Sequence, residues 1–194
     1  MPSQIRHIGI TGLPLAIFRR VLEAAPPGCV DVVRGSKVIS FTLKPYPQAL
    51  SYCRYHLADT ALLRLLPLLH AKRVGVINAS PLSMGLLTDA GPPAWHPAPP
   101  ALKEACAAAA AQCRARGGDL ARLAIQHAVR HDDIATTLVG MCTREQVRAN
   151  VACAVAAFAP PSEEDVAMRA VVDAILAPVM GITWSSGRSD NNGE

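Results

Sequence analysis

The chain has 194 residues, of which 51% are hydrophobic and 18% are charged, so it is large enough for one domain with a sizeable core and too apolar to be disordered. Its formal net charge is +4, but aromatic residues make up only 4% and no Lys/Arg stripe is interleaved with them, so we expect no nucleic-acid partner. No apolar run reaches the roughly 18 to 20 residues of a membrane span, so we expect no membrane partner either.

The first elements in chain order are a strand, a helix and a second strand. Residues 5–10 have the pattern of a strand, and residues 15–24 carry apolar side chains on one side at helical spacing. The sequence Pro26-Pro27-Gly28 ends that helix, and residues 29–33 are predicted to form the next strand. This order of elements is the beginning of a βαβ unit.

A helix and a short buried strand come next. The helix is predicted over residues 59–72, with Pro67 kinking it or marking its effective start. Residues 74–77 are a short apolar run that suits a strand buried on both faces, and Pro81 ends that strand. Small residues and Gly85 follow, so the backbone stays accessible just past the carboxyl end of the strand, where parallel α/β proteins bind ligands. The alternative is a buried strand followed by an ordinary loop.

The rest of the chain is divided by clear helix caps. An alanine-rich helix is predicted over residues 101–116, followed by a helix capped by Asp119 and a strand over residues 134–141. The next helix runs to about residue 158, with Thr143 and Gln146 as a capping box, and the last helix covers residues 162–176. Strands therefore alternate with helices, which favours parallel βαβ units in an α/β fold.

The cysteines and histidines give no metal signature. The 6 cysteines form no C-x-x-C pair, and their scattering favours reduced thiols in a cytoplasmic protein. No signal-peptide core follows Met1. His127 and His131 share a predicted helix end without a third ligand, so we expect a solvated helix end and no metal site.

Several of these blocks together resemble the aldo-keto reductases. The residues Ser80-Pro81-Leu82 match the loop that follows the seventh strand of that family, where Ala79 replaces the usual aromatic residue. The adjoining Met84-Gly85 block and the Gly91–Pro97 block are similar to a plant branch of the family that oxidises L-galactose. The similarity covers residues 5–31 and 50–187.

This resemblance implies the C-terminal half of a (β/α)8 TIM barrel, with strands five to eight and their helices. Residues 1–187 would form a partial oxidoreductase domain, and residues 188–194 a disordered tail. Residues 34–49 have no counterpart in the family, so we expect an insertion that interrupts a central strand. The alternative is a surface hairpin with a strand over residues 38–43.

The implied activity is NAD-dependent oxidation of L-galactose to L-galactono-1,4-lactone in ascorbate biosynthesis, with the sugar as small-molecule substrate. The catalytic Asp, Tyr, Lys and His of the family lie on its first four strands and have no counterpart here. We therefore expect no catalytic residue in this chain, and no activity from it alone.

The resemblance also implies cofactor-binding residues at the exits of all the strands. Those implied for the nicotinamide are Thr11, Gly12 and Tyr52; for the pyrophosphate, Ser80, Leu82 and Met84; and for the adenosine end, Gly140, Met141, Gln146 and Asn150. Neither Gly140 nor Gln146 offers a charge to a 2′-phosphate, which favours NAD over NADP.

Three interpretations stay open at this stage. The chain is a truncated enzyme that is inactive alone, or a half-barrel that binds a nucleotide or another protein without catalysis, or an incomplete reading of a full enzyme. A half-barrel leaves sheet edges open, so we expect self-association through those edges.

Overall fold

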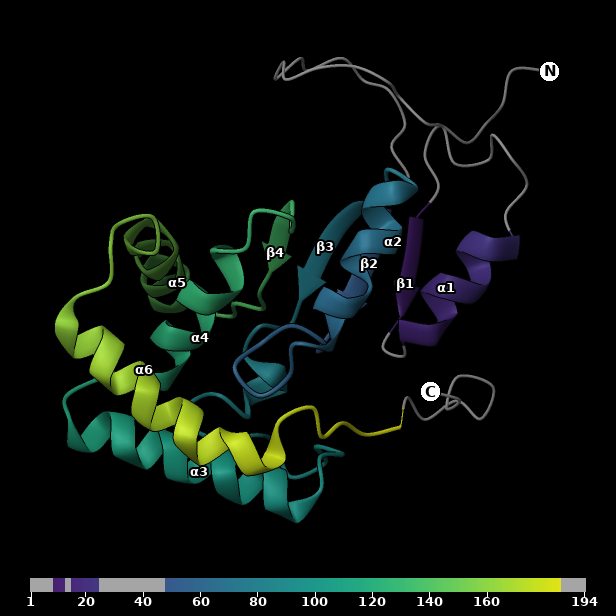
Figure 1. Cartoon of the computed structure of the whole chain (residues 1–194). Coiled ribbons are helices and arrows are strands. Elements are labelled where there is room, and N and C mark those ends of the chain that lie inside the picture. The colour runs from purple at the N-terminus through teal and green to yellow at the C-terminus, as the bar shows by residue number, and fades with distance from the viewer. Residues whose placement is uncertain (1–8, 13–14, 25–47, 186–194) are drawn as a thin grey trace.

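The computed structural model describes residues 9–12, 15–24 and 48–185. Within them, four strands form one parallel sheet in the order β1-β2-β3-β4 (Figure 1). The strands are β1 (Gly9–Gly12), β2 (Gln48–Tyr52), β3 (Gly75–Ala79) and β4 (Thr136–Leu138). Since spatial order follows sequence order, each strand lies beside the next along the chain, as βαβ units require.

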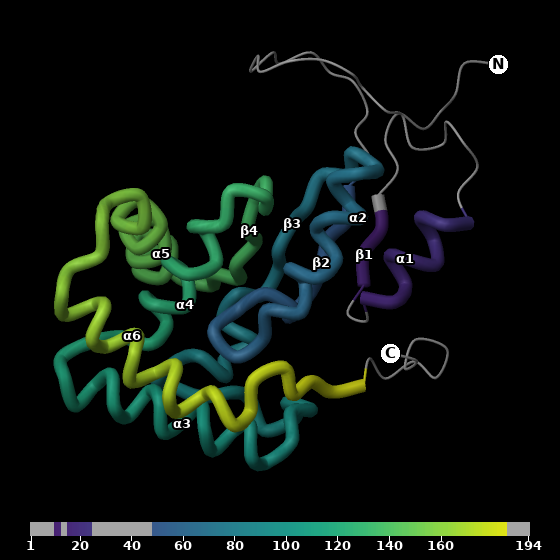
Figure 2. The backbone as a smooth tube through the Cα atoms, viewed as in Figure 1, coloured from purple at the N-terminus to yellow at the C-terminus, as the bar shows by residue number. Residues whose placement is uncertain are grey.

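Helices lie between and after the strands. The α-helices are α1 (Leu15–Ala24), α2 (Leu66–Ala71), α3 (Pro100–Ala115), α4 (Leu120–Val129), α5 (Arg144–Ala156) and α6 (Glu163–Leu176). Short 3-10 helices are η1 (Ala61–Arg64), η2 (Ser83–Gly85) and η3 (Ala177–Val179). The backbone trace shows α1 beside β1 at one end of the sheet, and α5 beyond β4 at the other end (Figure 2).

The two faces of the sheet differ in burial. Ala49 of β2 and its partner Val76 of β3 are buried and pack with Phe18 of α1 and Leu69 of α2. Side chains alternate along a strand, so Leu50 and the other residues next to these point to the opposite face. That second face we call the inner face. Its central row is in register across the sheet and is half-buried or exposed: Thr11, Leu50, Ile77 and Thr136.

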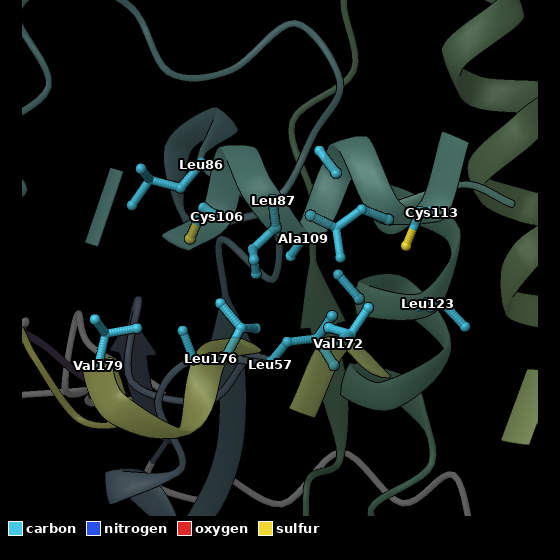
Figure 3. Packing of buried hydrophobic residues seen from close by; sticks show 14 of the residues in the cluster. Leu57, Leu86, Leu87, Cys106, Ala109, Cys113, Leu123, Val172, Leu176 and Val179 are labelled. Atoms are coloured by element: carbon cyan, nitrogen blue, oxygen red, sulfur yellow. The ribbon is translucent and has the colours of Figure 1, made fainter. Parts of the chain in front are cut away.

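A second core lies away from the sheet, between the long helices. Helix α3 contributes Cys106, Ala109 and Cys113, and α6 contributes Val172 and Leu176 (Figure 3). The short side chains of alanine and cysteine on α3 let the two helices pack closely. This core therefore makes the alanine-rich helix part of the folded body.

The first two units confirm some of the predicted elements and correct others. The helix over residues 15–24 is confirmed. The first strand, predicted over residues 5–10, is described over Gly9–Gly12, so it ends two residues later than predicted, and residues 5–8 lie outside the described residues. The predicted strand over residues 29–33 and the alternative strand over 38–43 also lie outside them. Gln48 and Ala49 were expected in the insertion but belong to β2, where they pair with Gly75 and Val76. The insertion expected over residues 34–49 is therefore wrong at its last two residues.

The later elements follow their predicted caps. Asp119 accepts from the Ala121 N–H at 2.8 Å, and Thr143 and Gln146 form the capping box. The helix predicted over residues 59–72 is instead split into η1 and α2, with Pro67 in the first turn of α2. The strand predicted over residues 134–141 is limited to Thr136–Leu138. The Ser80 N–H donates to the Leu138 carbonyl at 3.0 Å, and the chain leaves the sheet after this residue. The predicted tail, residues 188–194, lies outside the described residues.

Candidate functional site

The carboxyl ends of the strands lie at one edge of the sheet, because the sheet is parallel. The predicted cofactor-binding residues follow this edge: Thr11 and Gly12 end β1, Tyr52 ends β2, and the remaining residues follow β3 or β4. Ligands of parallel α/β proteins bind at this edge. The structure thus brings the residues at the strand exits to one edge of the sheet, while Gln146 and Asn150 lie within α5, and the contact of all of them with a cofactor stays a prediction.

At the exit of β1, Thr11 is exposed on the inner face and Gly12 is half-buried. A Cβ on Gly12 would lie 2.7 Å from Cγ2 of Ile17, so only glycine lets α1 start this close to the strand. The polar groups that β1 offers at its exit are therefore the Thr11 hydroxyl and the backbone.

At the exit of β2, Tyr52 points to the inner face and pairs with Ala79 of β3. Burial raises the pKa of Tyr52, while its hydrogen bond with the Ser80 side chain lowers it. The next residue, Cys53, turns the chain with φ +56° and donates its N–H to the Ala79 carbonyl at 3.0 Å. Burial raises the pKa of Cys53 to about 11, so its thiol stays protonated at neutral pH.

The loop after β3 is held in an uncommon backbone conformation. Ser80, Ser83 and Met84 have φ of +63°, +50° and +53°, which side-chain-bearing residues rarely adopt. The Ser80 hydroxyl accepts from the Met84 N–H at 3.1 Å, and the Ser80 carbonyl accepts from the Ser83 N–H at 2.9 Å. Such strain persists where the surrounding contacts hold it, and it is common at ligand sites.

Glycine is required where this loop passes its own return path. Gly85 has φ +97°, and a Cβ there would lie 3.1 Å from the Gly91 carbonyl oxygen. Leu82, within the same loop, is half-buried and packs against the core between the long helices. The loop is therefore anchored on its apolar side.

A buried histidine supports this loop from below. His96 Nδ1 accepts from the Ala98 N–H at 3.1 Å, so the proton is on Nε2, which donates to the Ser83 carbonyl at 3.1 Å. The ring also meets Trp184 edge to face, with centroids 4.9 Å apart. Burial lowers the pKa of His96, which keeps it neutral in this bridging role.

Past β4, the capping box of α5 uses the side chain of Gln146. Its Oε1 accepts from the Cys142 N–H at 2.7 Å and from the Thr143 N–H at 3.3 Å. Gln146 thus directs its carbonyl oxygen at the backbone of its own helix, and any contact with an adenosine must come from its amide nitrogen. Gly140 and Met141 are exposed, and Asn150 is half-buried.

A buried polar group next to this edge was missed by the sequence reasoning. Arg54 and Asp59 pair at 3.1 Å with side chains only 4% and 1% exposed. His56, between them, is fully buried, and burial lowers its pKa to about 3. Asn78 of β3 donates to the Tyr55 carbonyl at 3.0 Å. These contacts hold the loop after β2; the density of polar residues over 54–59 was the available signal.

His127 of α4 and His131, which follows the end of that helix, are half-buried, whereas we expected a solvated helix end. The His127 ring stacks on Tyr55 with centroids 4.9 Å apart, and His131 meets the same ring edge to face at 5.5 Å. Burial, and then the charge of Arg169, lower the pKa of His127 to about 4. The expectation holds for Asp132 and Asp133, which are exposed, and is corrected for the two histidines, because their long-range contact with Tyr55 leaves no mark in the local sequence. Within the described residues, no three His, Cys, Asp or Glu side chains are grouped as metal ligands would be.

The chemistry offered at this edge is that of binding. Hydroxyls from Thr11 and Ser80 and the N-terminus of α5 are donors suited to the oxygen atoms of a nucleotide. Within the described residues, no helix is both long and apolar enough to cross a bilayer.

The sequence of the chain is similar to those of known proteins. The model of the Aldo/keto reductase family matches residues 4–170. L-galactose dehydrogenase of Arabidopsis thaliana is 46% identical over 189 residues, which are 97% of this chain and 54% of that protein. D-arabinose 1-dehydrogenase of Saccharomyces cerevisiae is 32% identical over 127 residues, 64% of this chain and 35% of that protein.

Solved structures show the same fold. The holo and apo forms of an aldo-keto reductase from Bacillus halodurans align with TM-scores of 0.54 and 0.55 at 19% identity. The alignments cover 94% of this chain, and 53% and 54% of those chains. The chain thus spans about half the length of the Arabidopsis protein and of these Bacillus halodurans chains.

Proposed function

The chain belongs to the aldo/keto reductase family, and on that premise we propose that it is the nucleotide-holding half of an NAD-dependent L-galactose dehydrogenase. The four strands are then strands five to eight of a (β/α)8 barrel. The reaction is oxidation of L-galactose to L-galactono-1,4-lactone, in the cytoplasm, on the plant route to ascorbate. The identity with the Arabidopsis protein along almost the whole chain carries this proposal.

The geometry supports the nucleotide part of the proposal. We call the inner face at the carboxyl ends of the strands the mouth. Thr11 and Tyr52 lie there and would hold the nicotinamide. When bound, the nicotinamide accepts a hydride from the sugar. The loop from Ser80 to Met84 would hold the pyrophosphate through the Ser80 hydroxyl, since the N–H groups of Ser83 and Met84 already donate to Ser80. The first turn of α5 adds a positive dipole end for the adenosine side.

We propose in addition that this chain alone does not turn over L-galactose. A general acid or base must lie within hydrogen-bond reach of the reacting hydroxyl and have a tuned pKa. Tyr52 is the titratable group that points into the mouth from β2, and burial raises its pKa, which suits orientation more than proton transfer at neutral pH. His56 is buried within the loop after β2, and His127 is half-buried against the ring of Tyr55.

The choice of NAD over NADP follows from charge. A 2′-phosphate needs cationic donors, and neither Gly140 nor Gln146 supplies a charge. Arg144 and Arg148 are exposed and four positions apart, on one side of α5. The Gln146 side chain instead accepts from the Cys142 N–H at the start of the helix. This supports the view that Gln146 and the two arginines point in different directions.

The test joins this chain to the part that it lacks relative to the Arabidopsis protein. The first half of that relative is placed before Ile5, and NAD reduction with L-galactose is followed by absorbance at increasing cofactor concentrations. We expect activity from the joined protein, none above a heat-treated control from the chain alone, and tighter binding of NAD than NADP. A joined protein that folds but does not use L-galactose would refute the substrate, and preference for NADP would refute the cofactor.

A non-catalytic role is the second candidate. In the part of the chain that the structure describes, the inner face of the sheet is only partly covered, which is unusual for parallel strands and suits a protein that binds another half. Nucleotide binding by the chain without any gain of activity in the joined protein would favour that role.

A further inference from the structure

A cavity of about 140 Å³ lies where α4, α6 and the loop that precedes α6 meet. The two helices lie close together (Figure 1), and the Arg122 side chain of α4 donates to the Asp165 carboxylate of α6 at 3.1 Å. Close by, Nη1 of Arg169 donates to Nδ1 of His127 at 3.2 Å. None of the residues that line this cavity is among those predicted to hold the cofactor, so it is a site of its own.

One polar side chain of this cavity has no partner in the fold. Gln126 lines the cavity together with Leu123 and Arg130, which lie three and four positions away along α4 and so share its face. The residue is 5% exposed, and within the described residues its amide takes part in no hydrogen bond. Buried amides are normally bonded, and an unsatisfied one costs free energy. A ligand oxygen in the cavity would satisfy the N–H groups of Gln126.

The charges around the cavity do not cancel. Asp165 is neutralised by its pair with Arg122. Arg169 is paired with Asp173 at 2.7 Å, so this second pair is also neutral as a whole. Arg130 lines the cavity as well, and in the part of the chain that the structure describes it forms no ion pair. One positive charge therefore faces the cavity without a balancing negative one.

The position of Arg130 is fixed by a contact with the backbone. Its Nε donates to the Ala157 carbonyl at 2.9 Å, which leaves the two terminal nitrogens of the guanidinium for another acceptor. Burial, and then the charge of Arg169, lower the pKa of His127 to about 4, so this ring adds no charge to the cavity at neutral pH. The group that suits this corner therefore carries a single negative charge.

The remaining wall of the cavity is apolar. Leu123 is buried, while Pro161 and Val166 line the side nearer to the solvent. A cavity of about 150 Å³ holds one molecule the size of benzene, so a ligand of about six non-hydrogen atoms fits here. An apolar wall beside a cationic corner suits a molecule with one charged end and a short hydrocarbon body.

We propose that this cavity binds a small monocarboxylate, with its carboxylate on Arg130 and Gln126 and its hydrocarbon chain against Leu123 and Val166. A guanidinium presents its donors as a fork that matches a carboxylate, and the bonds are strengthened by charge. The bound anion balances the charge of Arg130 and gives the Gln126 amide its missing partner. The inference goes beyond the proposed function, in which none of these residues takes part.

The test is an NMR titration of the purified 194-residue chain at pH 7 with butyrate, which has six non-hydrogen atoms. We expect saturable shifts of the backbone amide signals of α4 and α6, which give both the place of binding and the dissociation constant. Butyramide has the same shape without the charge and should bind at least about tenfold more weakly. Inorganic phosphate lacks the hydrocarbon body and should also bind more weakly than butyrate.

Variants of the two polar residues test the assigned contacts. Arg130→Gln should raise the dissociation constant of butyrate at least about tenfold, because it removes the charged partner. Gln126→Leu keeps the size of the side chain without its amide and should raise that constant about fivefold. Arg116→Gln is the matched control: it removes the same charge from an exposed position after α3 and should leave the constant unchanged. Circular dichroism confirms that the variants stay folded.

Each other outcome contradicts the proposal. A folded chain whose α4 and α6 signals do not respond to butyrate overturns it, and so does an equal effect of Arg130→Gln and Arg116→Gln. Butyramide that binds as tightly as butyrate would show that charge is not recognised. Phosphate that binds more tightly would show that the apolar wall is not used. None of these measurements involves NAD or L-galactose, so their failure is distinct from failure of the proposed function.

Discussion

The side-chain amide of Asn78 donates to the backbone carbonyl of Tyr55 at 3.0 Å, across a sequence separation of 23 residues. Asn78 is fully buried near the end of β3, and Tyr55 belongs to the loop that follows β2. This bond ties together the exits of the two central strands, where Tyr52 and Ser80 are presented. The position of the mouth thus depends on a residue that does not face it.

We expect Asn78→Leu to lower the free energy of unfolding by about 1–3 kcal/mol, because it leaves the buried Tyr55 carbonyl without its donor. Urea unfolding followed by circular dichroism measures the loss. Thr137→Val is the matched control, since Thr137 is the strand partner of Asn78 and its hydroxyl donates to the Ala128 carbonyl at a half-buried position. An equal loss in the two variants would mean that the Asn78 bond has no special weight.

Two glycines of one loop should respond differently to a methyl group. Gly85 and Gly91 both have positive φ, +97° and +69°, so alanine at either strains the backbone by about 1 kcal/mol. At Gly85 the new Cβ also meets the Gly91 carbonyl at 3.1 Å, whereas at Gly91 it meets nothing within 4 Å. Thermal unfolding should therefore show the larger loss for Gly85→Ala. A larger loss for Gly91→Ala would contradict this account of the loop.

The stability of the chain should fall as the pH drops below about 6.5. Burial lowers the pKa of His56 to about 3, while the unfolded chain binds a proton near the ordinary histidine value of about 6.5. The contribution is therefore complete above pH 6.5 and declines toward pH 3, by up to about 1.4 kcal/mol per pH unit. His127, with its pKa lowered to about 4, adds in the same direction.

His56→Asn isolates that contribution, because the asparagine oxygen can still accept from the Ala58 N–H as Nδ1 does at 3.2 Å. Urea midpoints at pH 7 and pH 5 should differ less in this variant than in the parent chain. His70→Asn, at an exposed position of α2, serves as the control and should keep the parental difference. The same pH dependence in His56→Asn and the parent would count against a buried neutral His56.

Tyr52→Ala should weaken NAD binding by the purified chain about fivefold or more, if Tyr52 holds the nicotinamide, since stacking on an aromatic ring is worth about 1 kcal/mol or more. Titration calorimetry gives the affinity. Gln48→Ala is the matched control, because Gln48 lies on the same face of the same strand at the far end from the mouth. Unchanged affinity in Tyr52→Ala, or an equal loss in Gln48→Ala, would remove Tyr52 from the site.

Local features of this chain could be determined from its sequence. The caps at Asp119 and Thr143, the helix over residues 15–24 and the break at Pro67 all appear as predicted, because each depends on residues within a few positions. The parallel α/β class also followed from the alternation of elements. The edge that carries the candidate site was predictable for the same reason, since parallel strands bring all their exits together.

Tertiary structure alone decided the features that depend on distant partners. Gln48 and Ala49 looked like the end of an insertion, but pairing with Gly75 and Val76 makes them a strand. His127 and His131 looked solvated, but the ring of Tyr55, far earlier in the chain, contacts both and leaves them half-buried. Hydrogen bonds between strands and ring contacts join residues whose separation leaves no periodic trace in the sequence, so these outcomes appear only once the chain is folded.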